Sequence, residues 1–290
     1  MIHRFIITIL SFVNFSLLSQ QIDVLQLTEG NFSSRYPVWS PDGSKIAFES
    51  DRTGNWDLFI LEYQSGEVHA ITTSDASDRF PAWSPNGKQI LFVSDRDGET
   101  DLYTFNISSG SIERVAKLPG NELFPAWSSD GSEIGFSREL EDSFEMLRFS
   151  IEDQSTINFL DQTGRDLWPR WSPDNSRLVF FSRRDTGGED DEIYILEIES
   201  GNVKRLTNGP GHDFCPTWNP DANLIVFVSI EEDGSRFLCI TNIEGIEKSR
   251  LGQGFFRVTE PSWSPDGKYI IYTGAKNSGD KYNLFIESVQ

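Results

Sequence analysis

The chain is poor in the residues that build metal centres and covalent cross-links. Its 290 residues include two cysteines, Cys215 and Cys239, and three histidines, no two of which have the spacing of metal ligands. A histidine-rich zinc centre is therefore disfavoured, and we expect His69 on an outer strand and His212 in a solvated loop. The sequence has no Gly-x-Ser-x-Gly nucleophile elbow and no glycine-rich phosphate loop, but its many carboxylates leave a glycosidase-like pair open.

Long apolar runs are also scarce, and the one clear example lies at the N-terminus. Residues 5–18 are mostly apolar, follow Arg4 and precede the small residue Ser19. A run shorter than about 20 residues does not suit a membrane-spanning helix, whereas it does suit a secretory signal. We predict a signal peptide over residues 1–19, a mature domain over residues 20–290, and a periplasmic or secreted protein with no membrane insertion after cleavage. An uncleaved anchor is the alternative.

Positive charge is the third shortage, since 25 lysines and arginines face 45 aspartates and glutamates, for a formal net charge of −20. Such a chain repels nucleic acid and anionic membrane surfaces and favours cationic partners or metal ions. Solubility alone is the alternative reason for the charge.

A tryptophan recurs along the chain at a nearly fixed interval. Subtracting successive positions gives intervals of 44, 44, 44, 47 and 45 residues for Trp39, Trp83, Trp127, Trp171, Trp218 and Trp263. Two copies continue as Trp-Ser-Pro-Asp-Gly and two more as close variants that keep the glycine, which closes a tight hairpin. Asn175 tolerates the same left-handed conformation, whereas we expect Ala222 to force another turn shape.

Each repeat predicts four short strands. In the first they are residues 36–40, 45–50, 57–63 and 68–72, and the second strand of each repeat is almost continuously apolar, as expected for burial on both faces. Four-stranded units of this length predict an all-β, six-bladed β-propeller. The last repeat lacks its fourth strand, so we expect residues 24–28 to complete that blade and close the ring.

The two cysteines are expected on the first and third strands of the fifth blade. Adjacent strands are about 4.8 Å apart, so the two thiols would lie roughly 9–10 Å apart. A disulfide needs Cα atoms within about 7 Å. We therefore predict two buried free thiols.

The repeat resembles that of TolB-type six-bladed propellers. The resemblance is carried by Pro-x-Trp-Ser-Pro-Asp-Gly, an apolar strand, and Ser-Asp-Arg-x-Gly-x-x-Asp-Leu-Tyr at residues 94–103, with a second copy at residues 50–59. It covers about residues 22–290. The same repeat occurs in the periplasmic TolB protein, in propellers of serine oligopeptidases and in some polysaccharide-degrading proteins. We expect no TolB-like α/β domain here, so the resemblance implies the propeller part alone.

Two further positions recur ahead of each tryptophan. Five residues upstream, four of six repeats carry an acid, and three residues upstream, four carry an aromatic ring. We expect both in loops that cross between blades at the mouth of the central channel, where they would form a ring of carboxylates backed by aromatics. The alternative is that the aromatics pack blade to blade and the acids form turns. The predicted binding residues are Asp78, Glu122, Asp166, Asp213, Arg35, Arg79, Arg170, Tyr36, Phe80, Phe124 and Trp168.

These observations favour a non-catalytic binding propeller. It would hold a peptide, a protein partner or a cation at the acidic mouth, with a cationic partner expected. No organic cofactor is predicted, although the ring is compatible with a cation such as calcium. The alternatives are a carboxylate-based polysaccharide-degrading enzyme and an accessory or gating propeller for a separately encoded peptidase.

Overall fold

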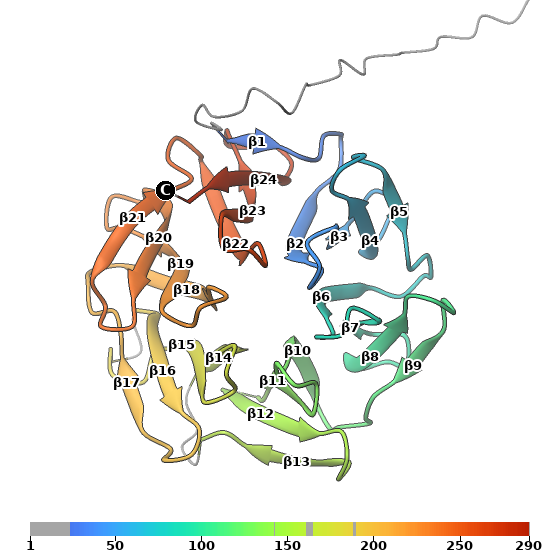
Figure 1. Cartoon of the computed structure of the whole chain (residues 1–290), viewed down its shortest axis with the longest axis horizontal. Helices are drawn as coiled ribbons and strands as arrows, with labels where there is room; N and C mark the ends of the chain where they lie inside the picture. Colours follow the sequence, from blue (N-terminus) through green and yellow to red (C-terminus); the bar gives the residue numbers. More distant parts are fainter. Residues whose placement is uncertain (1–23, 142, 161–164, 188–189, 290) are drawn as a thin grey trace, which may run out of the picture.

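Six four-stranded antiparallel sheets surround a central axis in the computed structural model (Figure 1). The structure describes residues 24–141, 143–160, 165–187 and 190–289. The predicted signal peptide lies outside these residues. Within them the secondary structure is all β-strand, and none of the described residues forms a helix long and apolar enough to cross a membrane. The predicted six-bladed β-propeller is confirmed.

Each blade runs from an inner strand beside the axis to an outer strand at the rim. The first two blades comprise β2 (Ser34–Trp39), β3 (Lys45–Ser50), β4 (Asp57–Glu62) and β5 (Val68–Ala70), then β6 (Asp78–Trp83), β7 (Gln89–Ser94), β8 (Asp101–Asn106) and β9 (Ile112–Arg114). The third and fourth comprise β10 (Asn121–Trp127), β11 (Glu133–Glu139), β12 (Phe144–Ser150) and β13 (Ser155–Asn158), then β14 (Asp166–Trp171), β15 (Arg177–Ser182), β16 (Glu192–Glu197) and β17 (Val203–Arg205). The fifth blade comprises β18 (His212–Trp218), β19 (Leu224–Ile230), β20 (Arg236–Asn242) and β21 (Glu247–Leu251).

The sixth blade joins the two ends of the chain. Its sheet has the order β1-β24-β23-β22, where β1 is Leu25–Gln26, β22 is Arg257–Trp263, β23 is Tyr269–Ala275 and β24 is Asn283–Ser288. Leu25 pairs with Ile286, and the Leu27 amide donates to the Leu284 carbonyl at 2.8 Å. The N-terminal strand therefore supplies the missing outer strand and closes the ring, as predicted.

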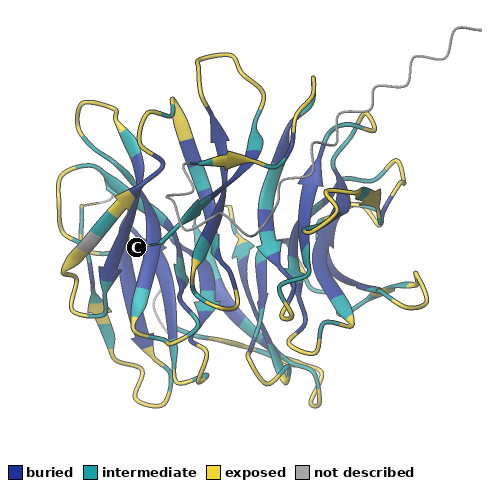
Figure 2. Ribbon diagram, turned by 45° about the horizontal axis from the view of Figure 1, so that its top comes forward, coloured by how far each residue is buried: buried dark blue, intermediate teal, exposed yellow. Residues whose placement is uncertain are grey.

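The core lies between the blades. The second strands are almost fully buried because each is covered on both faces. In Figure 2 buried residues, in dark blue, lie within the strands, and exposed residues, in yellow, lie mostly in the loops. Five of the six repeat tryptophans are between 6% and 9% exposed, and Trp127 is somewhat more so. These residues therefore belong to the core, although all of them except Trp39 also line a hollow on the axis described below.

The tryptophan hairpins share one turn conformation, including the copy expected to differ. Ala222 has φ of 56°, close to the 59° of Asn175 and the 70° of Gly43, and its amide donates to the Asn219 carbonyl as the Gly43 amide donates to that of Ser40. The expectation of another turn shape at Ala222 was wrong. The sheet on either side imposes the turn, and the strain of a left-handed alanine is accepted there.

Cys215 lies on β18 and Cys239 on β20, and both are buried free thiols, as predicted. His69 lies on outer strand β5, but His212 is the first residue of β18 rather than part of a loop. Its Nδ1 accepts a hydrogen bond from the Asp191 amide at 3.3 Å. His212 therefore helps to join the fourth and fifth blades.

Candidate functional site

A bulge in every inner strand directs one side chain towards the axis. The ladder between first and second strands shifts register at the same place in all six blades, for example between Arg35 and Val38. A proline stands two residues before each tryptophan, and it cannot donate a ladder hydrogen bond. The residue before that proline has φ between 53° and 67° in each blade. The six residues are Tyr36, Phe80, Phe124, Trp168, Cys215 and Glu260.

These six residues form what we call the plug. Tyr36 lies 4.6 Å from Phe80 and 5.7 Å from Trp168 between ring centroids, and Phe124 lies 4.7 Å from Phe80 and 4.8 Å from Trp168. The rings come from four consecutive blades, so their contacts span the channel. Cys215 and Glu260 are buried at the two remaining positions. The structure thus brings the four predicted aromatics together, as a packed cluster.

Two buried glutamates anchor the plug on the face where the inner strands begin, which we call the entry face. Glu260 accepts the Tyr36 amide at 2.9 Å and the Arg35 guanidinium at 2.5 Å. Glu49 makes the same two contacts with the second blade, since it accepts hydrogen bonds from the Phe80 amide at 3.0 Å and the Arg79 guanidinium at 2.9 Å. Burial raises the pKa of Glu49, while Arg79 opposes the rise. Arg35 and Arg79 are 25% and 29% exposed, so they form the accessible rim of this site.

The four predicted carboxylates lie in the inner strands rather than in crossing loops, and the structure does not gather them at the mouth. Asp78 is buried and accepts Arg96 at 2.8 Å, and Asp166 is buried and accepts Ser182 at 2.6 Å and Arg184 at 2.8 Å. Each of these carboxylates is thus held inside its own blade.

The other two carboxylates have unusual environments. Burial raises the pKa of Asp213 to about 6, although hydrogen bonds from Ser229 and Thr207 oppose the rise. Glu122 is fully buried, and neither of its carboxylate oxygens has a hydrogen-bond partner in the structure. Burial, with Asp101 nearby, raises the pKa of Glu122 to about 8.

Arg52 and Asp57 flank one hairpin, and Arg96 and Asp101 flank the equivalent hairpin of the next blade, but the two members of each set do not pair with each other. Arg96 turns inward to Asp78, and Asp101 pairs instead with Arg114 on the outer strand. Arg52 donates to Ser50 and Ser34, because the first blade has serine where the second has Asp78. The recurring arginines therefore brace the starts of the inner strands.

The opposite face, where the Trp-Ser-Pro-Asp-Gly hairpins lie, is hollow. We call this hollow the funnel; it has a volume of about 470 Å³ and is walled by tryptophans, prolines and small polar residues. Arg170 is the one ionisable side chain among the described residues that line it. Its guanidinium lies 4.4 Å from the Trp168 ring, so it stacks on the funnel side of the plug. Sequence reasoning assigned Arg170 to the acidic mouth, whereas the bulge carries it to the other side.

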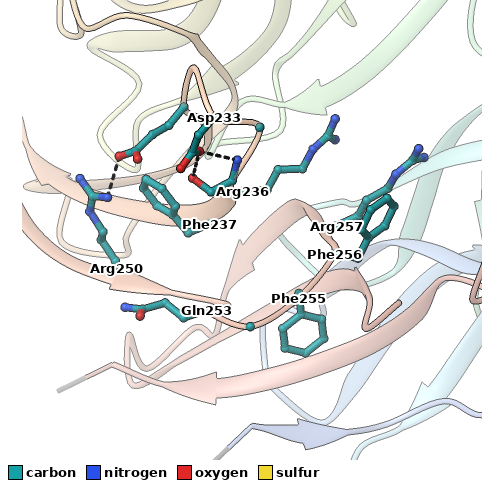
Figure 3. A pocket seen from close by; sticks show the side chains of 12 residues that line it. Asp233, Arg236, Phe237, Arg250, Gln253, Phe255, Phe256 and Arg257 are labelled. Atoms are coloured by element: carbon teal, nitrogen blue, oxygen red, sulfur yellow. Dashed lines mark hydrogen bonds and ion pairs between the residues drawn. The ribbon is translucent and has the colours of Figure 1, made fainter. Parts of the chain in front are cut away.

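A second hollow of about 680 Å³ lies between the β19–β20 hairpin and the loop leading to β22. Figure 3 shows Arg236 and Arg257 extending on the same side as the exposed ring of Phe256. Arg250, however, is paired with Glu231 and Glu247, and Arg257 donates to the Tyr282 hydroxyl. Because acids accompany the arginines, this hollow has weaker charge selectivity than the funnel.

The described ranges contain no metal-binding cluster. Those residues contain no group of three or more histidine, cysteine or acidic side chains placed to hold a metal ion. The cysteines are poor nucleophiles at neutral pH, since burial raises the pKa of Cys215 to about 12 and that of Cys239 still higher.

Comparison with known proteins identifies the family but not the activity. TolB from Acinetobacter baumannii superimposes with a TM-score of 0.71 at 22% identity, over 89% of this chain and 63% of that one. A gluconolactonase from Xanthomonas campestris superimposes with a TM-score of 0.66 at 13% identity, over 92% of this chain and 89% of that one. An oligogalacturonate lyase from Vibrio parahaemolyticus superimposes with a TM-score of 0.64 at 14% identity, over 92% of this chain and 93% of that one. At these identities the likeness shows the fold alone.

No curated protein matches the sequence. The family model described as the TolB beta propeller domain matches residues 10–189 and 157–289, which together span nearly the whole chain. On this evidence the chain belongs to the TolB beta propeller domain family.

Proposed function

We propose that this protein is a non-catalytic interaction propeller that binds a segment of a protein partner over the plug on its entry face. The observation that carries the proposal is the pair of arginines at the rim. Each is held by a buried glutamate and lies over aromatic rings. Arg35 is 5.1 Å from the Tyr282 ring, and Arg79 is 5.1 Å from the Trp56 ring.

This arrangement supports binding for an energetic reason. Arginine, tyrosine and tryptophan dominate the energetics of protein interfaces, chiefly because they offer large contact areas. A guanidinium already oriented by a carboxylate loses little further freedom when a partner binds. The plug beneath supplies a rigid apolar floor, with Tyr36 and Phe124 only half-buried.

The net charge supports a cationic partner, and at the rim Arg35 and Arg79 are neutralised by their ion pairs with Glu260 and Glu49. The protein has a formal net charge of −20, so its electrostatic field attracts positively charged segments from a distance. Asp78 and Asp166 would contribute indirectly, since their ion pairs hold the inner strands in place. Association should slow as salt rises, because screening shortens the range of the field to about 10 Å at 0.1 M.

The predicted signal over residues 1–19 supports a periplasmic or secreted location. Fractionation of the native host, with N-terminal sequencing of the purified protein, tests this part. A cytoplasmic protein that retains residues 1–19 would contradict it.

Site-specific photocrosslinking tests the interaction. A photoreactive phenylalanine replaces Tyr282 at the rim, and the matched control replaces Ile157, which is 50% exposed on outer strand β13 of the third blade. We expect an adduct specific to position 282, formed with one protein and weakened by Arg79→Gln. That partner, once purified, should bind the propeller in calorimetry.

Two results would contradict the interaction. One is an identical set of adducts at both positions. The other is turnover of a polysaccharide by the purified protein, which would replace the binding function with the enzymatic alternative.

A further inference from the structure

We infer that the funnel on the hairpin face is a carboxylate-binding site with Arg170 as its recognition residue. This site is separate from the proposed entry-face interaction, because the plug lies between the two.

The first argument is the break in repeat symmetry. The residue immediately before each tryptophan is small or neutral in five blades, whereas the fourth blade has Arg170. All six inner strands surround the axis (Figure 1), and this exchange makes Arg170 the one ionisable side chain among the described residues that line the funnel. The remaining walls are made of indole, proline and small polar side chains.

The second argument is the missing counter-charge. The Arg170 Nη1 donates to two carbonyl oxygens, those of Phe124 at 3.1 Å and Pro169 at 2.9 Å. In the described part of the chain, no carboxylate forms an ion pair with it. Burial lowers the pKa of Arg170 to about 10, so the group remains charged at neutral pH.

The third argument is the chemistry of the free donors. A guanidinium has five N–H groups in a planar fork, and of the Arg170 nitrogens only Nη1 donates to an acceptor among the described residues. A carboxylate matches this fork with two parallel hydrogen bonds. Thr217 and Ser262, which also line the funnel, could donate further hydrogen bonds to such a ligand.

The same wall suits the rest of a ligand. Trp171 and Trp218 offer apolar edges, and a volume of about 470 Å³ accommodates a few residues of chain or a small organic acid. The net charge of −20 disfavours polyanions at a distance. A ligand with one carboxylate and little other negative charge therefore fits best, either the C-terminus of a peptide or a free carboxylic acid.

The test compares a carboxylate with its uncharged analogue. Triglycine is titrated as the free acid and as the C-terminal amide, beside acetate, while the Arg170 Nε–Hε resonance and the tryptophan fluorescence are followed. We expect the acid to bind at least tenfold more tightly than the amide and to shift the Arg170 resonance. Tighter binding of triglycine than of acetate would indicate a chain terminus, and the reverse would indicate a free acid.

Variants separate recognition from folding. Arg170→Gln should remove the preference for the acid, and Arg170→Lys should retain part of it because the charge remains. Arg148→Gln is the matched control, since Arg148 pairs with Glu133 in the third blade and lies outside the funnel lining. If the Arg170 variants fail to fold, the shift of the Arg170 Nε–Hε resonance in the wild-type protein still shows whether a carboxylate binds there. Equal binding of acid and amide, or no shift of the Arg170 resonance with any carboxylate, would overturn the proposal.

Discussion

Glu122 should make the protein lose stability as pH rises, and Glu122→Gln should remove that loss. The side chain is fully buried at the start of β10, and both its oxygens lack hydrogen-bond partners. Arg138 lies opposite in the ladder, but its Nη2 donates to Glu145 at 2.7 Å. The carboxyl group is therefore neutral at neutral pH, with a pKa of about 8 against an ordinary value of 4.5.

The sign follows from proton binding. Between pH 4.5 and 8 the folded state holds the Glu122 proton while the unfolded state releases it, so the free energy of unfolding falls as pH rises. Each pH unit within that window changes the free energy by about 1.4 kcal/mol. The loss therefore reaches about 3 kcal/mol at pH 7 and on the order of 5 kcal/mol above pH 8. Glutamine has nearly the same shape and carries no such cost.

The measurement is chemical denaturation of both proteins from pH 4 to pH 9. The two should be equally stable near pH 4, and Glu122→Gln should become progressively more stable above pH 5. Glu113→Gln, the same exchange at an exposed site on β9, is the control and should show no such divergence. Parallel stability curves for wild type and Glu122→Gln would refute the reasoning.

Three further changes test the architecture. Deleting residues 24–28 should expose the edge of β24, and size-exclusion chromatography should show aggregation, whereas an unchanged melting temperature would contradict ring closure by β1. Trp83→Ala should cost about 3–5 kcal/mol in urea unfolding because the ring is buried in the core between blades, and a loss of under 1 kcal/mol would be inconsistent with that packing. Asp166→Asn should cost about 1–3 kcal/mol by the same assay, since Arg184 loses its buried partner; a neutral effect would show that this ion pair does not brace the strand.

The repeat alone determined the architecture. A tryptophan every 44 to 47 residues, a proline two positions earlier and an apolar second strand define a blade that cannot bury both faces by itself. Stacking of equivalent blades follows, and so does closure by residues 24–28, because the last repeat lacks an outer strand. The sequence also predicted correctly that Cys215 and Cys239 form no disulfide, because the spacing of strands within a blade sets the distance between them.

Tertiary structure decided where the functional groups point. Arg96 is close to Asp101 in the sequence, but it pairs with the buried Asp78, which lies 18 residues away on the inner strand. The prolines were a signal for the bulge, which turns the aromatic residues onto the axis and carries Arg170 past them into the funnel. The left-handed φ of Ala222 was likewise imposed by its flanking strands. Periodicity fixes which residues are equivalent, whereas packing across the axis fixes which of them meet, because those contacts join residues from different blades.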